Sequence, residues 1–204
     1  MEFFIELNKL FKIFVFVFVN FLTFAPIKND IVNKTNYDLT KIKAFVFDID
    51  GVLSPASIPL HPSGEPMRII NTKDGYAMQL AAKKDFILGI ITGGDSSAIR
   101  TRFEALGFSY IITKAKSKIN DFRVFLQKTG LELDEVCYVG DDIPDLEIMQ
   151  VAGLPVCPAD AVPEIKKISR YISYKDGGMG VGRDIIEQVL KAQGKWMQDD
   201  AFTW

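Results

Sequence analysis

The most regular feature of the chain is an alternation of short apolar runs with segments of helical periodicity, which begins at residue 42. The apolar runs are rich in β-branched and aromatic residues and mostly lack polar alternation, which indicates strands covered on both faces. Strands are predicted at 44–47, 86–92, 110–113, 135–140, 154–158 and 171–174. Helices are predicted near 75–84, 96–106, 118–129, 143–151, 161–169 and 180–193. This order predicts an α/β fold with a doubly wound parallel sheet.

One segment, residues 52–73, interrupts the alternation. Its sequence, LSPASIPLHPSGEPMRIINTKD, contains turn residues and short extended pieces but no helical periodicity. We predict a β-hairpin flap after the first strand. No insertion here or later is long enough to form a separate cap domain.

The chain divides into three parts by composition. Residues 1–41 combine an almost wholly apolar stretch at 11–24 with a polar linker, residues 42–193 form the α/β domain, and residues 194–204 are an aromatic tail. The apolar stretch is shorter than the roughly 20 residues of a bilayer span, and its basic flank is poor because Glu2 and Glu6 offset Lys9 and Lys12. A membrane anchor, a signal segment and a non-native upstream extension are the alternatives, and we favour the extension.

Charge and cysteine content narrow the function classes. The net charge of −2 over 204 residues gives no electrostatic basis for nucleic-acid binding. Cys137 and Cys157 lie in apolar runs without metal-ligand spacing, which favours small buried side chains in a reducing compartment. The one histidine, His61, lies in a predicted turn, which disfavours a zinc site or a catalytic triad. We expect a cytoplasmic protein.

Polar side chains gather where the predicted strands end. Since the carboxyl ends of parallel strands meet at one edge of a sheet, these groups are expected to lie together. They comprise five carboxylates, a hydroxyl and an ammonium: Asp48, Asp50, Asp141, Asp142, Asp145, Thr92 and Lys118. Clustered aspartate oxygens suit Mg²⁺, and a cation would remove the repulsion between them.

This set of groups is suited to phosphoryl transfer. Asp48 is placed to attack phosphorus, and Asp50, two residues on, to act as general acid and base. Thr92 and the N–H groups that follow it are suited to bind phosphate oxygens, and Lys118 to offset charge on nucleophile and phosphate. Each motif alone is weak, but their order along the chain, each at a strand end, is specific.

Four segments together, FDIDGVLS, ITGG, Lys118 and VGDDIPDLEIM, resemble the haloacid dehalogenase superfamily of phosphotransferases over residues 42 to 193. FDIDGVLS, NTKDGYAMQL, YVGDDIPDLEIM, GLPVCPADA and GGMGVGRDIIEQVLKAQGKW are similar, more narrowly, to the capless 3-deoxy-D-manno-octulosonate 8-phosphate phosphatases. The resemblance implies Mg²⁺-dependent hydrolysis of a sugar acid phosphate on the route to lipopolysaccharide. It also implies a homotetramer in which neighbouring subunits cover the active site.

The same resemblance implies roles for individual residues. Asp48 is the expected nucleophile and Asp50 the acid/base, with the metal held by Asp48, Asp50 through its carbonyl, and Asp141. Thr92 and Gly93 are expected to hold phosphate. The supporting positions are Lys118 beside the nucleophile, Asp74 near the substrate, and Asp142 and Asp145 behind the metal ligands.

The chain departs from the family pattern at Gly94, where members that act on the octulosonate carry Arg and relatives that act on a nine-carbon sugar acid carry Glu. The substrate carboxylate then needs another partner, for which Arg68 in the flap and Arg183 are the candidates. Arg183 is equally well explained as a surface arginine paired with an aspartate. The apolar tail, with Trp196, is expected to dock on a neighbouring subunit together with the flap.

Other functions remain open at this point. The same chemistry could serve another keto sugar acid phosphate, and a non-catalytic tetramerising domain of the family is a further possibility. A signalling receiver module shares the fold class, but it carries its phosphorylated aspartate after a middle strand and needs no group such as Asp50.

Overall fold

A six-stranded, all-parallel sheet forms the centre of the domain in the computed structural model, which describes residues 37–203. The strand order is β3-β2-β1-β4-β5-β6. The strands are β1 Ala44–Phe47, β2 Ile87–Ile91, β3 Tyr110–Ile112, β4 Val136–Val139, β5 Leu154–Cys157 and β6 Tyr171–Ile172. The predicted parallel sheet is confirmed. The apolar stretch at 11–24 and Trp204 lie outside the described residues.

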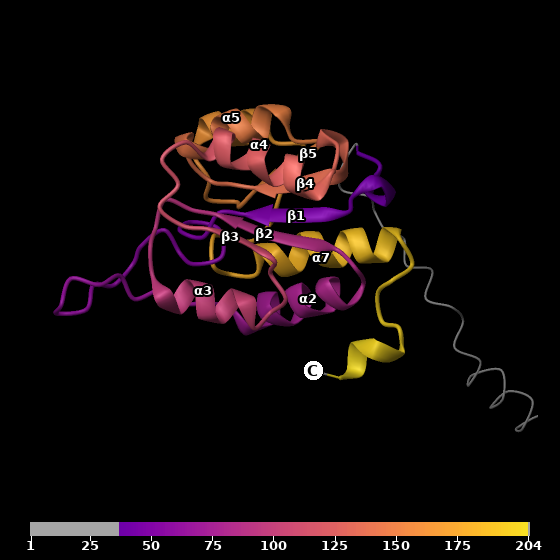
Figure 1. The fold of residues 1–204 in the computed structure, drawn as a ribbon, viewed down its shortest axis with the longest axis horizontal. Helices are drawn as coiled ribbons and strands as arrows, with labels where there is room; N and C mark the ends of the chain where they lie inside the picture. Colours follow the sequence, from indigo (N-terminus) through magenta and orange to yellow (C-terminus); the bar gives the residue numbers. More distant parts are fainter. Residues whose placement is uncertain (1–36, 204) are drawn as a thin grey trace, which may run out of the picture. The chain divides into compact units, whose positions relative to one another are not determined.

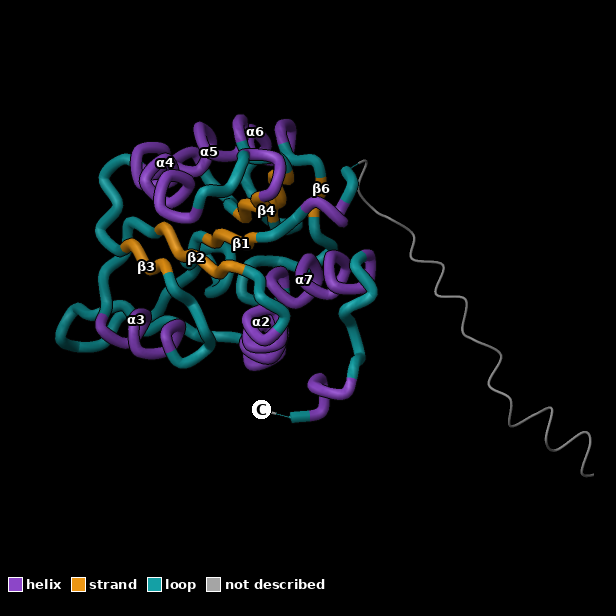
Figure 2. The backbone as a smooth tube through the Cα atoms, turned by 45° about the vertical axis from the view of Figure 1, so that its right-hand side comes forward, coloured by secondary structure: helices purple, strands orange, loops and turns teal. Residues whose placement is uncertain are grey.

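Helices cover both faces of the sheet, as the term doubly wound implies (Figure 1). One layer consists of α2 Thr72–Lys83, α3 Ser97–Glu104 and α7 Val181–Ala192. The opposite layer consists of α4 Lys118–Thr129, α5 Leu146–Val151 and α6 Pro163–Ile168, which Figure 2 shows side by side. Short 3-10 helices stand at Leu39–Lys41, Leu133–Glu135, Ile143–Asp145 and Asp199–Phe202.

The central strand explains why the strands lack polar alternation. Phe45 and Phe47 enter the core beneath α2 and α7, whereas Ala44 and Val46 enter the core beneath α4 and α5. All four are fully buried. At roughly 25 cal/mol per Å² of apolar surface, burial on both faces makes this strand a principal contributor to stability.

The predicted hairpin flap is present, but it does not form a ladder. Leu60 and Pro66 make an isolated antiparallel bridge, and the N–H of His61 donates to the carbonyl of Glu65 over 2.8 Å. The segment holds Pro55, Pro59, Pro62 and Pro66. Because proline has no N–H to donate, a regular ladder cannot propagate through it.

Helix α2 begins at Thr72, earlier than predicted. The side chain of Asn71 accepts a hydrogen bond from the N–H of Lys73 over 2.9 Å, which caps the helix. Asp74 therefore lies in the first helical turn and not in the loop before it. Within residues 37–203, no helix has the length and apolarity needed to cross a membrane.

The tail folds onto its own domain in the described chain. The hydroxyl of Tyr76 on α2 donates to the carbonyl of Ala201 over 2.7 Å, and Lys84 pairs with Asp200 at 2.6 Å. The ring of Trp196 meets that of Tyr76 edge-on. Helix α2 thus offers the tail an aromatic ring and lysines within the same chain, and the docking of the tail on a neighbouring subunit stays a prediction.

Candidate active site

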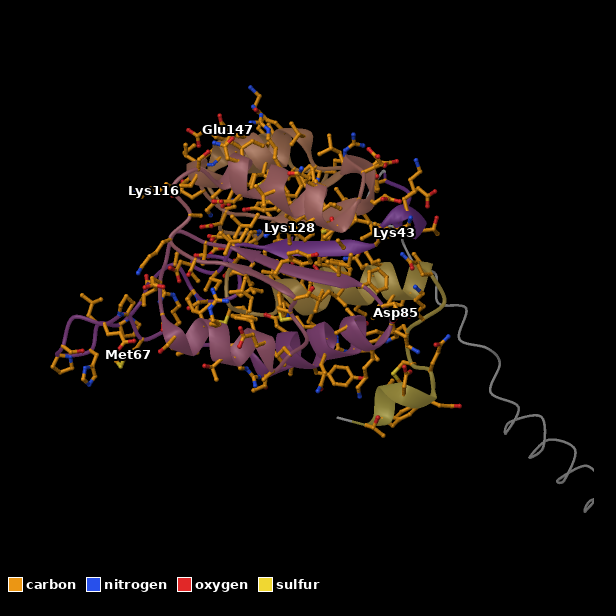
Figure 3. The ribbon with its side chains drawn as sticks, viewed as in Figure 1. Lys43, Met67, Asp85, Lys116, Lys128 and Glu147 are labelled. Atoms are coloured by element: carbon orange, nitrogen blue, oxygen red, sulfur yellow. The ribbon has the colours of Figure 1, made fainter. Side chains whose placement is uncertain are left out.

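The candidate site lies at the point where the strand order reverses, between β1 and β4. Strand β1 pairs with β2 on one side and with β4 on the other, so a crevice opens beyond their carboxyl ends. A cavity of about 820 Å³ there is lined by Asp48, Asp50, Thr92, Gly93, Lys118, Asp141, Asp142 and Asp145, among others. Figure 3 labels two residues of its rim, Lys116 and Glu147.

A buried lysine joins two of the predicted carboxylates. Lys118, the first residue of α4, places Nζ 2.9 Å from Asp48 Oδ1 and 2.7 Å from Asp145 Oδ1. Both the lysine and Asp48 side chains are only 8% exposed. Burial alone lowers the pKa of Lys118, but the carboxylates of Asp145 and Asp48 outweigh it and hold that pKa above its ordinary value. Lys118 is thus a fixed positive charge beside Asp48.

A tyrosine that sequence reasoning missed supports this arrangement. Tyr138, in the middle of β4, is fully buried, and its hydroxyl donates to Asp145 Oδ1 over 2.6 Å. Asp145 Oδ2 accepts the N–H of Asp141 over 3.3 Å, so both oxygens of Asp145 are occupied. Asp145 therefore holds Lys118 in position, and its own buried carboxylate is little exposed to the cavity. In the sequence, the only indication of this role within β4 is that Tyr138 carries a hydroxyl group in an otherwise apolar strand.

The carboxylates of Asp48, Asp141 and Asp145 form a cluster suited to a cation. One oxygen from each lies within 4.8 Å of the others. Burial, followed by repulsion from Asp145, raises the pKa of Asp48 to about 6. Burial and repulsion from Asp48 raise the pKa of Asp141 to about 7. Asp145 Oδ1 already accepts from Lys118 and Tyr138, which leaves the carboxylate oxygens of Asp48 and Asp141 as those best placed for Mg²⁺.

The turn after β1 brings these groups together. Gly51 has a φ of +92°, and a Cβ at this position would lie 2.0 Å from Asp141 Oδ2. The N–H of Gly51 donates to the carbonyl of Ser54 over 2.9 Å, and the N–H of Ser54 donates to the carbonyl of Ile49 over 2.8 Å. Only glycine combines this backbone conformation with so close an approach to Asp141.

The side chain of Asp50 faces a different partner. Its Oδ1 and Oδ2 accept hydrogen bonds from Arg68 Nε at 2.6 Å and Nη2 at 2.8 Å. This bidentate pair connects the flap to the β1 turn. Arg68 thus reaches the candidate site through Asp50, and its predicted contact with a substrate carboxylate stays a prediction.

Thr92 and Gly93 follow β2 directly at the base of the cavity. Thr92 is 1% exposed, and its Oγ1 accepts the N–H of Gly94 over 3.2 Å. A Cβ on Gly93 would meet nothing nearer than 4.0 Å, so the space beside its backbone is open. This open backbone next to a hydroxyl is suited to phosphate oxygens.

Two other predicted residues lie away from the lining of this cavity. The carboxylate of Asp74 accepts the N–H of Arg183 over 2.6 Å and so caps the start of α7. Burial raises the pKa of Asp74 to about 6. The guanidinium of Arg183 lies 4.6 Å from the Trp196 ring centroid and pairs with Glu187 at 2.6 Å. Within the described chain, Arg183 thus holds the tail.

Asp142 stands at the edge of the cavity. Its Oδ1 accepts the N–H of Ile143 over 2.7 Å, which caps the 3-10 helix Ile143–Asp145. The side chain is exposed and is not part of the three-carboxylate cluster. The expected role of Asp142 behind the metal ligands stays a prediction.

The glycine-rich loop before α7 supports the β1 turn from behind. The N–H of Gly178 donates to the carbonyl of Val52 over 2.8 Å. A Cβ on Gly177 would lie 2.1 Å from the carbonyl oxygen of Gly51. These glycines therefore allow backbone-to-backbone packing rather than contact with an anion.

Replacement of Gly177 by Ala should displace the β1 turn. We expect a loss of stability of about 1–3 kcal/mol from overpacking and a clear fall in kcat, since Gly51 lies next to Asp50. Gly64→Ala is the control, because a Cβ there meets nothing within 4 Å. In denaturant unfolding, the control should lose only the stability that the positive φ of residue 64 costs an alanine, and its kcat should be unchanged. An unaltered kcat in Gly177→Ala would contradict this role.

Metal-free protein should become more stable as the pH falls from about 7.5 to about 6, because carboxyls with raised pKa take up protons preferentially in the folded state. The contributing groups are Asp48, Asp141 and Asp74, whose ionisation in the folded state costs stability as the pH rises through about 6 to 7. Thermal unfolding with a chelator measures the trend. Asp48→Asn should reduce it, and Mg²⁺ should flatten it. A metal-free Tm that rises with pH over this range would contradict the assignment.

Comparisons with known proteins agree with this geometry. A family model described as haloacid dehalogenase-like hydrolase matches residues 81–185. The 3-deoxy-D-manno-octulosonate 8-phosphate phosphatase of Escherichia coli K12 is 32% identical over 172 residues, which cover 84% of this chain and 89% of that protein. The corresponding Yersinia pestis enzyme is 28% identical over the same length.

Solved structures show the same similarity. The Moraxella catarrhalis 3-deoxy-D-manno-octulosonate 8-phosphate phosphatase, in complex with magnesium ion, phosphate ion and KDO, is 33% identical with a TM-score of 0.75, and the match covers 83% of this chain and 95% of that one. The cobalt-bound Haemophilus influenzae phosphatase is 26% identical with a TM-score of 0.76, and the match covers 81% and 98%. The chain belongs to the haloacid dehalogenase-like hydrolase family and is a relative of its 3-deoxy-D-manno-octulosonate 8-phosphate phosphatases.

Proposed function

We propose that this protein is a Mg²⁺-dependent phosphomonoesterase that hydrolyses 3-deoxy-D-manno-octulosonate 8-phosphate to the free sugar acid and phosphate, a step in lipopolysaccharide precursor synthesis. The observation that carries the proposal is the buried Asp48–Lys118 pair beside Asp141, with Asp50 two residues further on. The similarity to phosphatases named for this substrate supports the choice of substrate.

The reaction would proceed in two successive displacements at phosphorus. An oxygen of Asp48 attacks phosphorus, the bond to the sugar oxygen breaks, and that oxygen takes a proton from Asp50. Water then attacks the aspartyl phosphate, gives its proton to Asp50 and releases phosphate. Lys118 stabilises negative charge on Asp48 and on the phosphoryl group throughout.

Mg²⁺ would be held by Asp48, Asp141 and the backbone carbonyl of Asp50, and would supply positive charge that offsets the phosphate and carboxylate charges. Carboxylates outnumber cations in the cavity lining, so a dianionic substrate cannot bind there without it. Thr92 Oγ1 and the N–H of Gly93 are the proposed donors to the phosphate oxygens at the opposite wall.

We also propose that the protein acts in the cytoplasm as a homotetramer. The cavity is open, and the flap exposes Leu60 at 67%, Met67 at 45% and Ile69 at 62%. Figure 3 shows Met67 on the projecting flap. Apolar side chains at the tip of an extended segment favour contact with another subunit, which would also shield the site from water.

Phosphate release from octulosonate 8-phosphate with Mg²⁺, beside the nine-carbon analogue and p-nitrophenyl phosphate, tests the activity. We expect selective turnover of the eight-carbon substrate, and a loss of about a thousandfold or more in kcat for Asp48→Asn. Asp85→Asn, at an exposed turn, is the matched control and should retain full activity. Selectivity for the nine-carbon ester would move the assignment to that substrate. A folded, Mg²⁺-binding protein inert toward every ester would identify a non-catalytic domain.

Light scattering coupled to size exclusion tests the assembly. The unaltered protein should elute with four times the mass of the chain, and Ile69→Glu should yield smaller species, because burying an unpaired carboxylate at an interface is unfavourable. Val124→Glu on α4 introduces the same change at another exposed apolar position and should leave the mass unaltered. A monomer with full activity would overturn the tetramer proposal.

A further inference from the structure

One side chain of the flap, that of Arg68, is buried, although the residues on either side of it in the sequence are exposed. Met67 and Ile69 are 45% and 62% exposed, whereas the side chain of Arg68 is only 8% exposed. The alternation follows from the extended backbone, which directs successive side chains to opposite sides. A guanidinium is rarely buried to this extent unless it has a specific anionic partner.

The loop after β2 provides the space for this guanidinium. A Cβ built on Gly94 would lie 2.5 Å from Arg68 Nη2 and 3.3 Å from its Cζ. The guanidinium therefore occupies the volume that a side chain at position 94 would fill. Gly94 and Arg68 are a matched pair: the glycine leaves room, and the flap supplies the positive charge.

The present partner of Arg68 leaves its hydrogen bonding incomplete. Nε and Nη2 hold both oxygens of Asp50, but Nη1 is buried and, within residues 37–203, has no hydrogen-bond partner. An unpartnered buried N–H group is unfavourable, so Nη1 keeps the capacity to donate to a further acceptor. Arg68 also lines a second cavity, of about 460 Å³, between the flap and α3. Its side chain therefore stands between that cavity and the one that holds Asp48.

We propose that Arg68 is the specificity-determining residue of this site, and that it exchanges Asp50 for a carboxylate of the substrate. While both oxygens of Asp50 are held by Arg68, they are not free to contact the leaving-group oxygen. A substrate carboxylate offers the guanidinium the same bidentate geometry and releases Asp50. The preferred substrates are thus phosphomonoesters that carry a carboxylate. This inference rests on the proposed phosphatase activity and deepens it.

Two esters that differ only in the carboxylate provide the test. 6-Phosphogluconate and glucitol 6-phosphate share one carbon chain, and kcat/KM for the acid should exceed that for the alcohol by about tenfold or more in the unaltered protein, as expected for a charged contact. In Arg68→Met this ratio should fall to about threefold or less, because the fall in kcat/KM should be larger for the acid than for the alcohol ester. Arg68→Lys should give an intermediate ratio. Arg123→Met, at an exposed arginine of α4, is the control and should keep the ratio.

Gly94→Ala provides an independent variant, since the added methyl group displaces the guanidinium without removing it. It should lower the ratio in the same direction as Arg68→Met. A ratio that is unchanged in both Arg68→Met and Gly94→Ala would overturn the inference, whatever the absolute activity.

Equilibrium binding separates this inference from the proposed function. Calorimetry with free 3-deoxy-D-manno-octulosonate involves no turnover, and Arg68→Met should weaken binding by about tenfold, which corresponds to about 1.4 kcal/mol. If no ester is hydrolysed but binding of the sugar acid still depends on Arg68, the proposed function fails and the specificity role stands. If octulosonate 8-phosphate is hydrolysed and neither binding nor the ester ratio depends on Arg68, the specificity role fails and the proposed function stands.

Discussion

The rest of the site depends on the contact of one lysine with two carboxylates. Lys118 Nζ lies within 3 Å of oxygens of Asp48 and Asp145, and all three side chains are largely buried. Without this ammonium, the carboxylates at the edge of the sheet would repel one another at low dielectric. With it, Asp48 is oriented and partly neutralised, but Asp141 still has a raised pKa. The remaining imbalance is the physical reason for a divalent cation at this site.

The fold supplies this arrangement through backbone geometry rather than through long side chains. Parallel strands β1 and β4 run side by side, so residues that immediately follow them converge at one edge. Glycines at 51, 140 and 177 allow chain segments to approach where a Cβ would collide. The flap then brings a guanidinium from outside the sheet to Asp50. The rigid sheet edge thus holds the groups proposed for chemistry, while the flap holds the group proposed for selectivity.

Much of this could be predicted from the sequence, because strand ends and apolar runs are local signals. The positions of Asp48, Asp50, Thr92 and Asp141 relative to the sheet follow from their places after buried strands. The contact between Arg68 and Asp50 could not be predicted, since it depends on how a proline-rich segment folds back. The helix-capping role of Asp74 likewise depends on the packing of α2 against α7, which joins residues far apart in the chain. The position of the tail on α2 is a tertiary preference of the same kind.

The central claim is that Asp48 becomes phosphorylated, and it is tested by trapping the intermediate. Protein quenched during turnover and reduced with borohydride should yield homoserine at position 48 in a mass spectrum of the digested chain, because reduction converts an aspartyl phosphate to that alcohol. Homoserine at position 48, absent without substrate, is the predicted result. Rapid turnover with no modification at Asp48, or with modification at another aspartate, would contradict the account.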